Sequence, residues 1–253
     1  MVALPASLAM AALLSAGSPP PAPAEPGAPA PEGPAASQPE KEPAAALLRR
    51  CMAAYGGERA KVRLGRVKVT GKVTSPLHPG EVGRYTRVFN RTSRLRMEIA
   101  FPGGAPDVRI LDGVRAFRYG EPVAGPIAAA LQLHAARLDL PALLLEWEPR
   151  VMDEGEVTHQ GQKVRVLGLE VAAGQRIEAG IDPRSGRILY VHGVSRGGPR
   201  EMDAYVVYGD FRKVDGVLVA FAEDSYANGE PLGQVELSTV EFPDDVPESE
   251  FLP

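Results

Sequence analysis

This chain of 253 residues has few of the side chains that metal and redox sites require. It contains one cysteine, Cys51, so it has no disulfide within the chain and no cysteine-rich metal site. Its four histidines are far apart, and none has the spacing of paired metal ligands: His78, His134, His159 and His192. We therefore expect neither a metal site nor another cofactor.

The sequence also lacks the signs of a nucleic-acid partner or a catalytic centre. Its formal net charge of −4 provides no basic surplus to attract phosphates. A Gly-x-Ser-x-Gly nucleophile turn is absent, and the glycine pairs at 103–104 and 197–198 do not lead into phosphate-binding helices. Asp153, Glu154 and Glu156 are typical of a solvated turn rather than of a catalytic carboxylate pair. We expect no catalytic residues, no enzyme activity and no nucleic-acid binding.

The first 43 residues are rich in Ala, Pro and Gly. Residues 2–16 form an apolar run that is too short to span a bilayer, so residues 1–24 resemble a secretory leader, although a disordered Ala-rich tail is the alternative. Residues 17–43 are too poor in large apolar side chains to pack, which predicts a disordered Pro/Ala-rich tether. A tether behind an export signal favours a periplasmic location.

The folded part is expected from residue 44 to 253. Residues 44–55 have helical composition and precede Gly56-Gly57, and one face carries Leu47, Leu48, Cys51, Met52 and Tyr55. Beyond Leu64 the apolar period becomes two, which predicts about five strands up to residue 119. Helical spacing returns at residues 126–147, interrupted by Pro141, and six or seven strands follow.

This order of elements predicts an α+β fold. Short connections favour antiparallel pairing, and a sheet of about 11 strands must curl. Its apolar face needs a cover, for which the first helix and the helical insert are the candidates. We therefore expect a curved, incompletely closed antiparallel β-barrel with helices over its concave face.

Several short motifs, in this order along residues 44–253, resemble the outer-membrane lipoprotein-sorting proteins, the LolA-like superfamily. They are turn residues and apolar alternations: Tyr55-Gly-Gly57, Leu95-Arg-Met-Glu98, Ile110-Leu-Asp-Gly113, Ala136-Arg-Leu-Asp-Leu-Pro141, Ile181-Asp-Pro-Arg-Ser-Gly186, the turn at 211–216 and Phe251-Leu-Pro253. The resemblance implies an unclosed barrel with a helical lid, a hydrophobic cavity that accepts acyl chains, and a soluble binding role in the periplasm.

The candidate cavity residues lie on one strand and on the helical insert. They could line a ligand cavity or fill a closed core: Leu95, Met97, Ile99, Phe101, Leu131, Leu138, Leu143, Leu144, Leu145 and Trp147. His134, on the same face of the insert, is typical of a buried, hydrogen-bonded histidine.

A group of arginines on two neighbouring strands has two interpretations. It forms either a solvated outer face that prevents edge pairing, which we favour, or a surface that attracts anionic head groups: Arg84, Arg87, Arg91, Arg94 and Arg96.

The favoured function is a monomeric periplasmic carrier or chaperone for acylated lipoproteins or lipids, with a transient inner- or outer-membrane partner. The alternative is an envelope sensor that binds lipid or mislocalised lipoprotein and signals to a membrane partner.

Overall fold

The computed structural model describes residues 42–91, 93–196 and 201–253. The predicted leader, residues 1–24, lies outside this part of the chain, as does the predicted tether except for its last two residues. None of the helices in these ranges combines the length and the apolar composition of a membrane-spanning segment.

The first half of the chain forms two helices and then six strands. Their bounds are α1 Ala44–Tyr55, α2 Glu58–Arg63, β1 Arg66–Thr74, β2 Gly83–Asn90, β3 Arg94–Ala100, β4 Asp107–Asp112, β5 Arg115–Arg118 and β6 Glu121–Val123. The predicted apolar face of α1 is confirmed, because all five of its predicted residues are buried.

A helical insert divides the strands into two sets. It consists of α3 Pro126–Leu138, α4 Ala142–Glu146 and the short 3-10 helix η1 Glu148–Arg150. Helix α3 begins where Gly125 adopts a φ of 62° and Pro126 occupies the first turn. Proline is tolerated in the first turn because an N–H group there would have no acceptor inside the helix, so its absence costs no hydrogen bond.

The second half of the chain adds seven long strands and a short 3-10 helix. They are β7 Met152–His159, β8 Gln162–Ala172, β9 Gln175–Ile181, β10 Ile188–Ser195, β11 Met202–Val214, β12 Val217–Ala227, β13 Glu230–Glu241 and η2 Glu248–Phe251.

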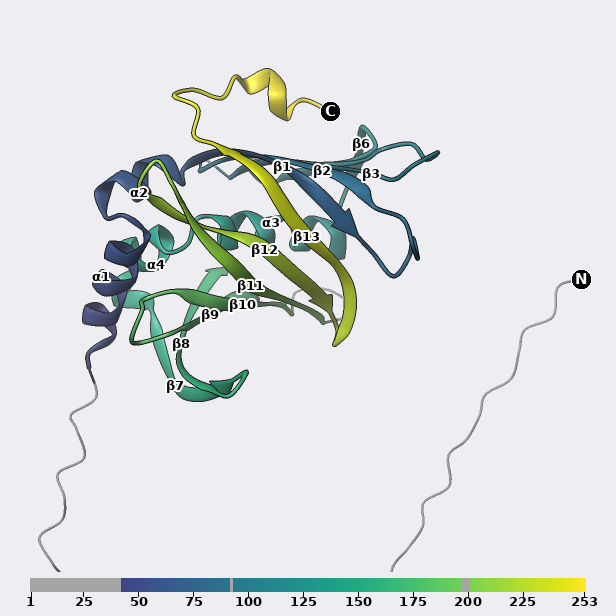
Figure 1. Ribbon diagram of the computed structural model, residues 1–253. Coiled ribbons are helices and arrows are strands. Elements are labelled where there is room, and N and C mark those ends of the chain that lie inside the picture. Colours follow the sequence, from purple (N-terminus) through teal and green to yellow (C-terminus); the bar gives the residue numbers. More distant parts are fainter. Residues whose placement is uncertain (1–41, 92, 197–200) are drawn as a thin grey trace, which may run out of the picture. The chain divides into compact units, whose positions relative to one another are not determined.

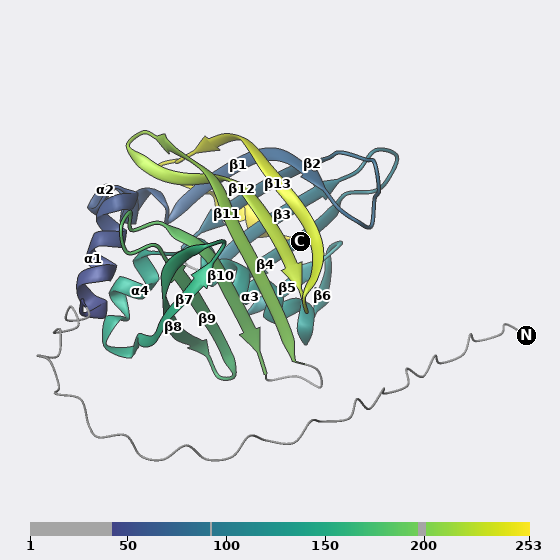
Figure 2. The same ribbon diagram turned by 60° about the horizontal axis from the view of Figure 1, so that its bottom comes forward.

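All 13 described strands belong to one antiparallel sheet. Its order is β6-β5-β4-β3-β2-β1-β13-β12-β11-β10-β9-β8-β7, so the first and last strands of the chain pair at its centre. The two edges, β6 and β7, are the strands directly before and after the insert. The chain therefore leaves the sheet at one edge, crosses as α3 and α4, and re-enters at the other edge (Figure 2).

The predicted fold class is confirmed. The sheet curves without closing, and α3 lies within its curve (Figure 1). The structure has two more strands than the 11 expected, and it adds the short helix α2. Strand β6 has only three residues, one of them Pro122, so alternation cannot identify it. In α2, Ala60 is the single buried residue, so it shows no apolar face.

Two apolar clusters fill the concave side, and two smaller ones lie on the outer face, one of them formed by Val164, Val166 and Tyr190. In the other, the C-terminal segment packs on β3 and β4, with Phe251 and Val246 against Val88 and Ile110. The outer face of the first strands is thus covered by the end of the chain, while the concave face is covered by the helices.

Candidate functional site

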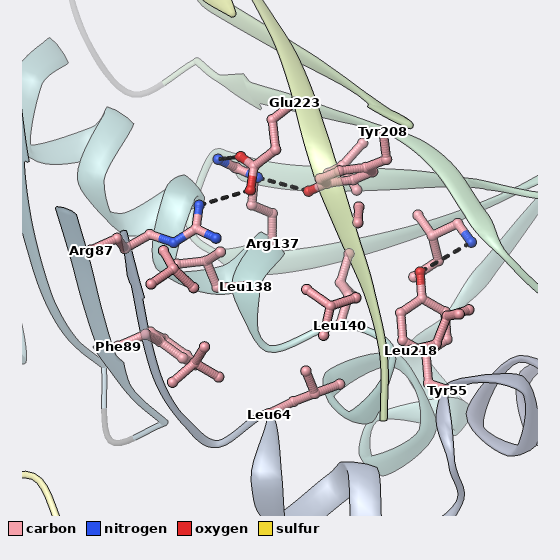
Figure 3. A pocket seen from close by; sticks show the side chains of 16 residues that line it. Tyr55, Leu64, Arg87, Phe89, Arg137, Leu138, Leu140, Tyr208, Leu218 and Glu223 are labelled. Carbon is pink, nitrogen blue, oxygen red and sulfur yellow. Dashed lines mark hydrogen bonds and ion pairs between the residues drawn. The ribbon is translucent and has the colours of Figure 1, made fainter. Parts of the chain in front are cut away.

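A cavity lies between the concave face of the sheet and the C-terminal end of α3 (Figure 3). Most of its wall is apolar, formed by side chains from α1, α3, both halves of the sheet and the connecting segments: Tyr55, Leu64, Val67, Val69, Phe89, Leu138, Leu140, Ile188, Val191, Leu218, Val219 and Ala220. Its free volume is about 90 Å³. Sites for small-molecule ligands usually measure about 300–1,000 Å³. With the helices in this position, the central cavity cannot hold an acyl chain.

Three charged side chains meet at one wall of this cavity, and we call them the buried ion cluster: Arg87, Arg137 and Glu223. Arg87 Nη1 donates to Glu223 Oε1 at 2.9 Å, and Arg137 Nη2 donates to Glu223 Oε2 at 2.9 Å. All three residues are nearly inaccessible, with exposures of 6%, 8% and 4% in that order. Because burial of an isolated charge is costly, the position of each one depends on the other two.

The cluster joins three elements that are distant in sequence. Arg87 takes an inward position on β2, between Tyr85 and Phe89, while Glu223 is inward on β12. Arg137 comes from the last turn of α3. The cluster therefore fastens the helical insert to both halves of the sheet.

Tyrosine and histidine side chains complete the cluster. Arg137 Nη1 donates to the Tyr208 hydroxyl at 2.8 Å, and Arg87 Nη1 lies 3.2 Å from the Tyr85 hydroxyl. Arg137 Nη2 is 3.0 Å from Nε2 of His134. Burial, together with the neighbouring Arg137 charge, holds the pKa of His134 well below its usual value, so this ring is neutral and accepts the hydrogen bond. The expected hydrogen-bonded histidine is thus observed.

Electrostatics keeps the carboxylate of the cluster ionised. Burial alone would raise the pKa of Glu223, but the charges and hydrogen bonds of Arg87 and Arg137 outweigh it and lower this pKa to about 2. At neutral pH the cluster therefore holds two positive charges and one negative charge.

A second set of ion pairs holds the far end of the insert. Arg91, just after β2, contacts Asp139 at 2.8 Å and Glu146 at 2.6 Å, and Lys61 of α2 contacts Glu146 at 3.2 Å. Burial raises the pKa of Asp139 to about 6, although Arg91 opposes this shift. The insert is thus fastened at α3 by the buried ion cluster and near α4 by a more exposed network.

A larger pocket of about 300 Å³ lies beside this network, and we call it the end pocket. Its apolar wall comes from the sheet and the insert, and its rim is polar: Phe89, Leu111, Ala135, Ala136, Leu143, Trp147, Leu169 and Val171, with Arg91, Gln132, Asp139 and Gln175. Phe89 borders both the end pocket and the central cavity. The two spaces therefore adjoin beneath α3.

The predicted cavity residues fall into two groups. Leu138 lines the central cavity, while Leu143 and Trp147 line the end pocket. The others pack in the apolar clusters and line neither space: Leu95, Met97, Ile99, Phe101, Leu131, Leu144 and Leu145. Direct contact of any of the ten with a ligand stays a prediction.

The structure corrects the favoured interpretation of the arginines as one outer face. Arg84, Arg94 and Arg96 lie on the outer side, where Arg94 pairs with Glu248 of the C-terminal segment. Arg87 and Arg91 instead line the two inner spaces. Strand alternation could have identified the inward position of Arg87, because side chains two residues apart point to the same face and Arg87 lies between the apolar Tyr85 and Phe89.

Within the described ranges, no group of three or more His, Cys, Asp or Glu side chains could hold a metal ion. Cys51 is buried in α1, and burial raises the pKa of its thiol far above the usual value, which makes it unreactive.

No family model matches the sequence, and no curated protein matches it. Solved structures do resemble the fold. A LolA superfamily protein from Nitrosomonas europaea superposes with a TM-score of 0.53 at 12% identity, over 79% of this chain and 95% of that chain.

Two other structures are more distant. An outer membrane lipoprotein-sorting protein domain from Vibrio parahaemolyticus gives a TM-score of 0.46 at 13% identity, over 82% of this chain and 95% of that chain. MucB from Pseudomonas aeruginosa, in complex with MucA, gives 0.22 at 14% identity, over 79% and 94%. The superposition on the Nitrosomonas protein shows that this chain has a LolA-like fold.

Proposed function

We propose that this protein is a periplasmic carrier that binds the acyl chains of lipoproteins or lipids beneath α3 and α4 and transfers them toward the outer membrane. The LolA-like fold and the leader-like start of the sequence support this proposal. The observation that carries it is the pair of adjoining spaces beneath the helical insert, with walls that are mostly apolar.

Binding of a chain requires the insert, residues 126–147, to move. The central cavity, at about 90 Å³, is too small for a long acyl chain, whereas the end pocket already offers about 300 Å³. Displacing Leu138 on α3 would enlarge the central cavity and connect it to the end pocket along Phe89. The insert then acts as a lid, and its ion pairs set the cost of opening it.

The energies of capture and release would be nearly balanced. Burial of a chain of roughly 16 carbons contributes on the order of 10 kcal/mol, at about 0.8 kcal/mol per methylene, before the cost of opening the lid. A membrane solvates the same chain about equally well. The direction of transfer therefore depends on the lid and on a transient membrane partner, with the carrier acting as a monomer.

Hydrogen exchange tests the lid directly. We expect residues 126–147 to change their protection when a palmitoylated peptide is added, because the chain enters beneath them. The outer segment at 248–251, which packs on the opposite face of the sheet, serves as the internal control. Identical protection of the insert with and without the peptide would contradict the proposal.

A further inference from the structure

The buried ion cluster does not balance its own charge. Two ionised arginines face one ionised carboxylate, since His134 is neutral and the tyrosine hydroxyls carry no charge at neutral pH. Within the described part of the chain, Glu223 is the single carboxylate that pairs with Arg87 or Arg137. One net positive charge thus remains at the wall of an apolar cavity, where solvation by water is poor.

The hydrogen bonds of the cluster leave donor capacity on Arg87. Both carboxylate oxygens of Glu223 already accept, one from each arginine. The two hydrogen bonds that Arg87 makes with described residues both come from Nη1, to Glu223 and Tyr85. Figure 3 shows the second terminal nitrogen of Arg87 directed away from Glu223, on the side of Leu138. An arginine presents its N–H groups as a planar fork that suits a carboxylate.

We propose that the ligand of this cavity is a single-chain amphiphile with one carboxylate, such as a long-chain fatty acid. The carboxylate binds Arg87 Nη2 and neutralises the cluster, while the hydrocarbon chain runs past Phe89 into the end pocket. This inference rests on the proposed function, because the chain enters beneath the same lid.

The charge of the site favours a carboxylate over other head groups. The free volume of about 90 Å³ exceeds the ~10–15 Å³ that one water molecule needs, so a small head group has room beside Arg87. A phosphate monoester carries nearly two negative charges, which would leave the cluster with an excess of negative charge. A neutral alcohol would leave the positive charge unpaired.

Matched ligands test the inference. Dodecanoic acid, 1-dodecanol and dodecyl phosphate share one chain length and differ in the head group, and their affinities are compared by titration calorimetry at pH 7.5. We expect the acid to bind about 10- to 100-fold more tightly than the alcohol, the range for a hydrogen bond to a charged group. We expect the phosphate to bind more weakly than the acid.

Three variants assign the preference to the cluster charge. Arg87→Met leaves Arg137 paired with Glu223, so the cluster becomes neutral and the preference for the acid is expected to disappear. Adding Glu223→Gln to Arg87→Met restores one positive charge on Arg137, and part of the preference is expected to return. Arg84→Met lies on the outer side of the same strand, where the Arg84 side chain is 70% exposed, and should leave the preference unchanged.

The outcomes separate this inference from the proposed function. If the wild-type protein binds acid and alcohol equally, the inference is overturned while the carrier proposal stands. If none of the three amphiphiles binds, the carrier proposal itself fails. If Arg87→Met does not fold, the wild-type comparison of acid with alcohol still decides. Tighter binding of the phosphate than of the acid would also overturn the inference.

Discussion

Replacing Glu223 by glutamine should destabilise the protein strongly, because it removes the one anion between two buried arginines. The pKa of Glu223 is lowered from 4.5 to about 2, a difference of about 2.5 units. At about 1.36 kcal/mol per unit, the cluster stabilises the ionised carboxylate by about 3 kcal/mol. Removal of one partner from a buried ion pair typically costs a similar amount.

The assay is urea denaturation of wild type and Glu223→Gln at pH 7, with Glu98→Gln as the control. Glu98 pairs at 3.3 Å with Arg84, whose side chain is 70% exposed. Exposed pairs contribute less than about 1 kcal/mol, so the control should be nearly neutral.

The pH dependence follows from the direction of the shift. A carboxyl group whose pKa is lower in the folded state stabilises the protein above its unfolded pKa. The contribution of Glu223 is therefore complete above pH 4.5 and is lost as pH falls from 4.5 toward 2. The Glu223→Gln variant lacks this loss. Equal effects of Glu223→Gln and Glu98→Gln at pH 7 would refute the account of the cluster.

Three further predictions concern other regions. Burial raises the pKa of Asp139 from 3.8 to about 6, so the free energy of unfolding of wild type should fall by about 3 kcal/mol relative to Asp139→Asn as pH rises from about 4 to 6. Parallel curves of unfolding free energy against pH for the two proteins would contradict this. Trp147 is the single tryptophan and lines the end pocket, so a brominated fatty acid should quench its emission, and unchanged emission at saturation would place the chain elsewhere. Phe251→Ala should lower the free energy of unfolding by about 3–5 kcal/mol in urea denaturation, because Phe251 is buried against Val88 and Ile110. Leu252→Ala removes an exposed neighbour and should lower it little, and similar losses in both variants would show that the outer cluster does not stabilise the sheet.

Local patterns predicted most of the elements. Period-two alternation located the strands, and helical spacing located α1 and the insert, because both periods reflect one buried face. The short strand β6 and the helix α2 lacked enough buried positions to produce such a signal.

Non-local contacts could not be predicted in the same way. The pairing of β1 with β13 and the contact between Arg87 and Glu223 join segments far apart in the chain, the latter separated by 136 residues. The residues around Arg87 in the sequence do not indicate that its ion-pair partner is Glu223. Because Arg87 alternates in step with Tyr85 and Phe89, the sequence could have predicted that Arg87 lies on the inner face. That position would have predicted a charge inside the apolar cavity.

The central claim is that a hydrocarbon chain becomes buried beneath the insert, and affinity as a function of chain length tests it most directly. Carboxylic acids of 8 to 16 carbons are titrated into the wild-type protein at one pH and salt concentration. We expect the dissociation constant to fall about fourfold per methylene, which corresponds to about 0.8 kcal/mol, until the space beneath the insert is full. A dissociation constant that does not depend on chain length would contradict the account.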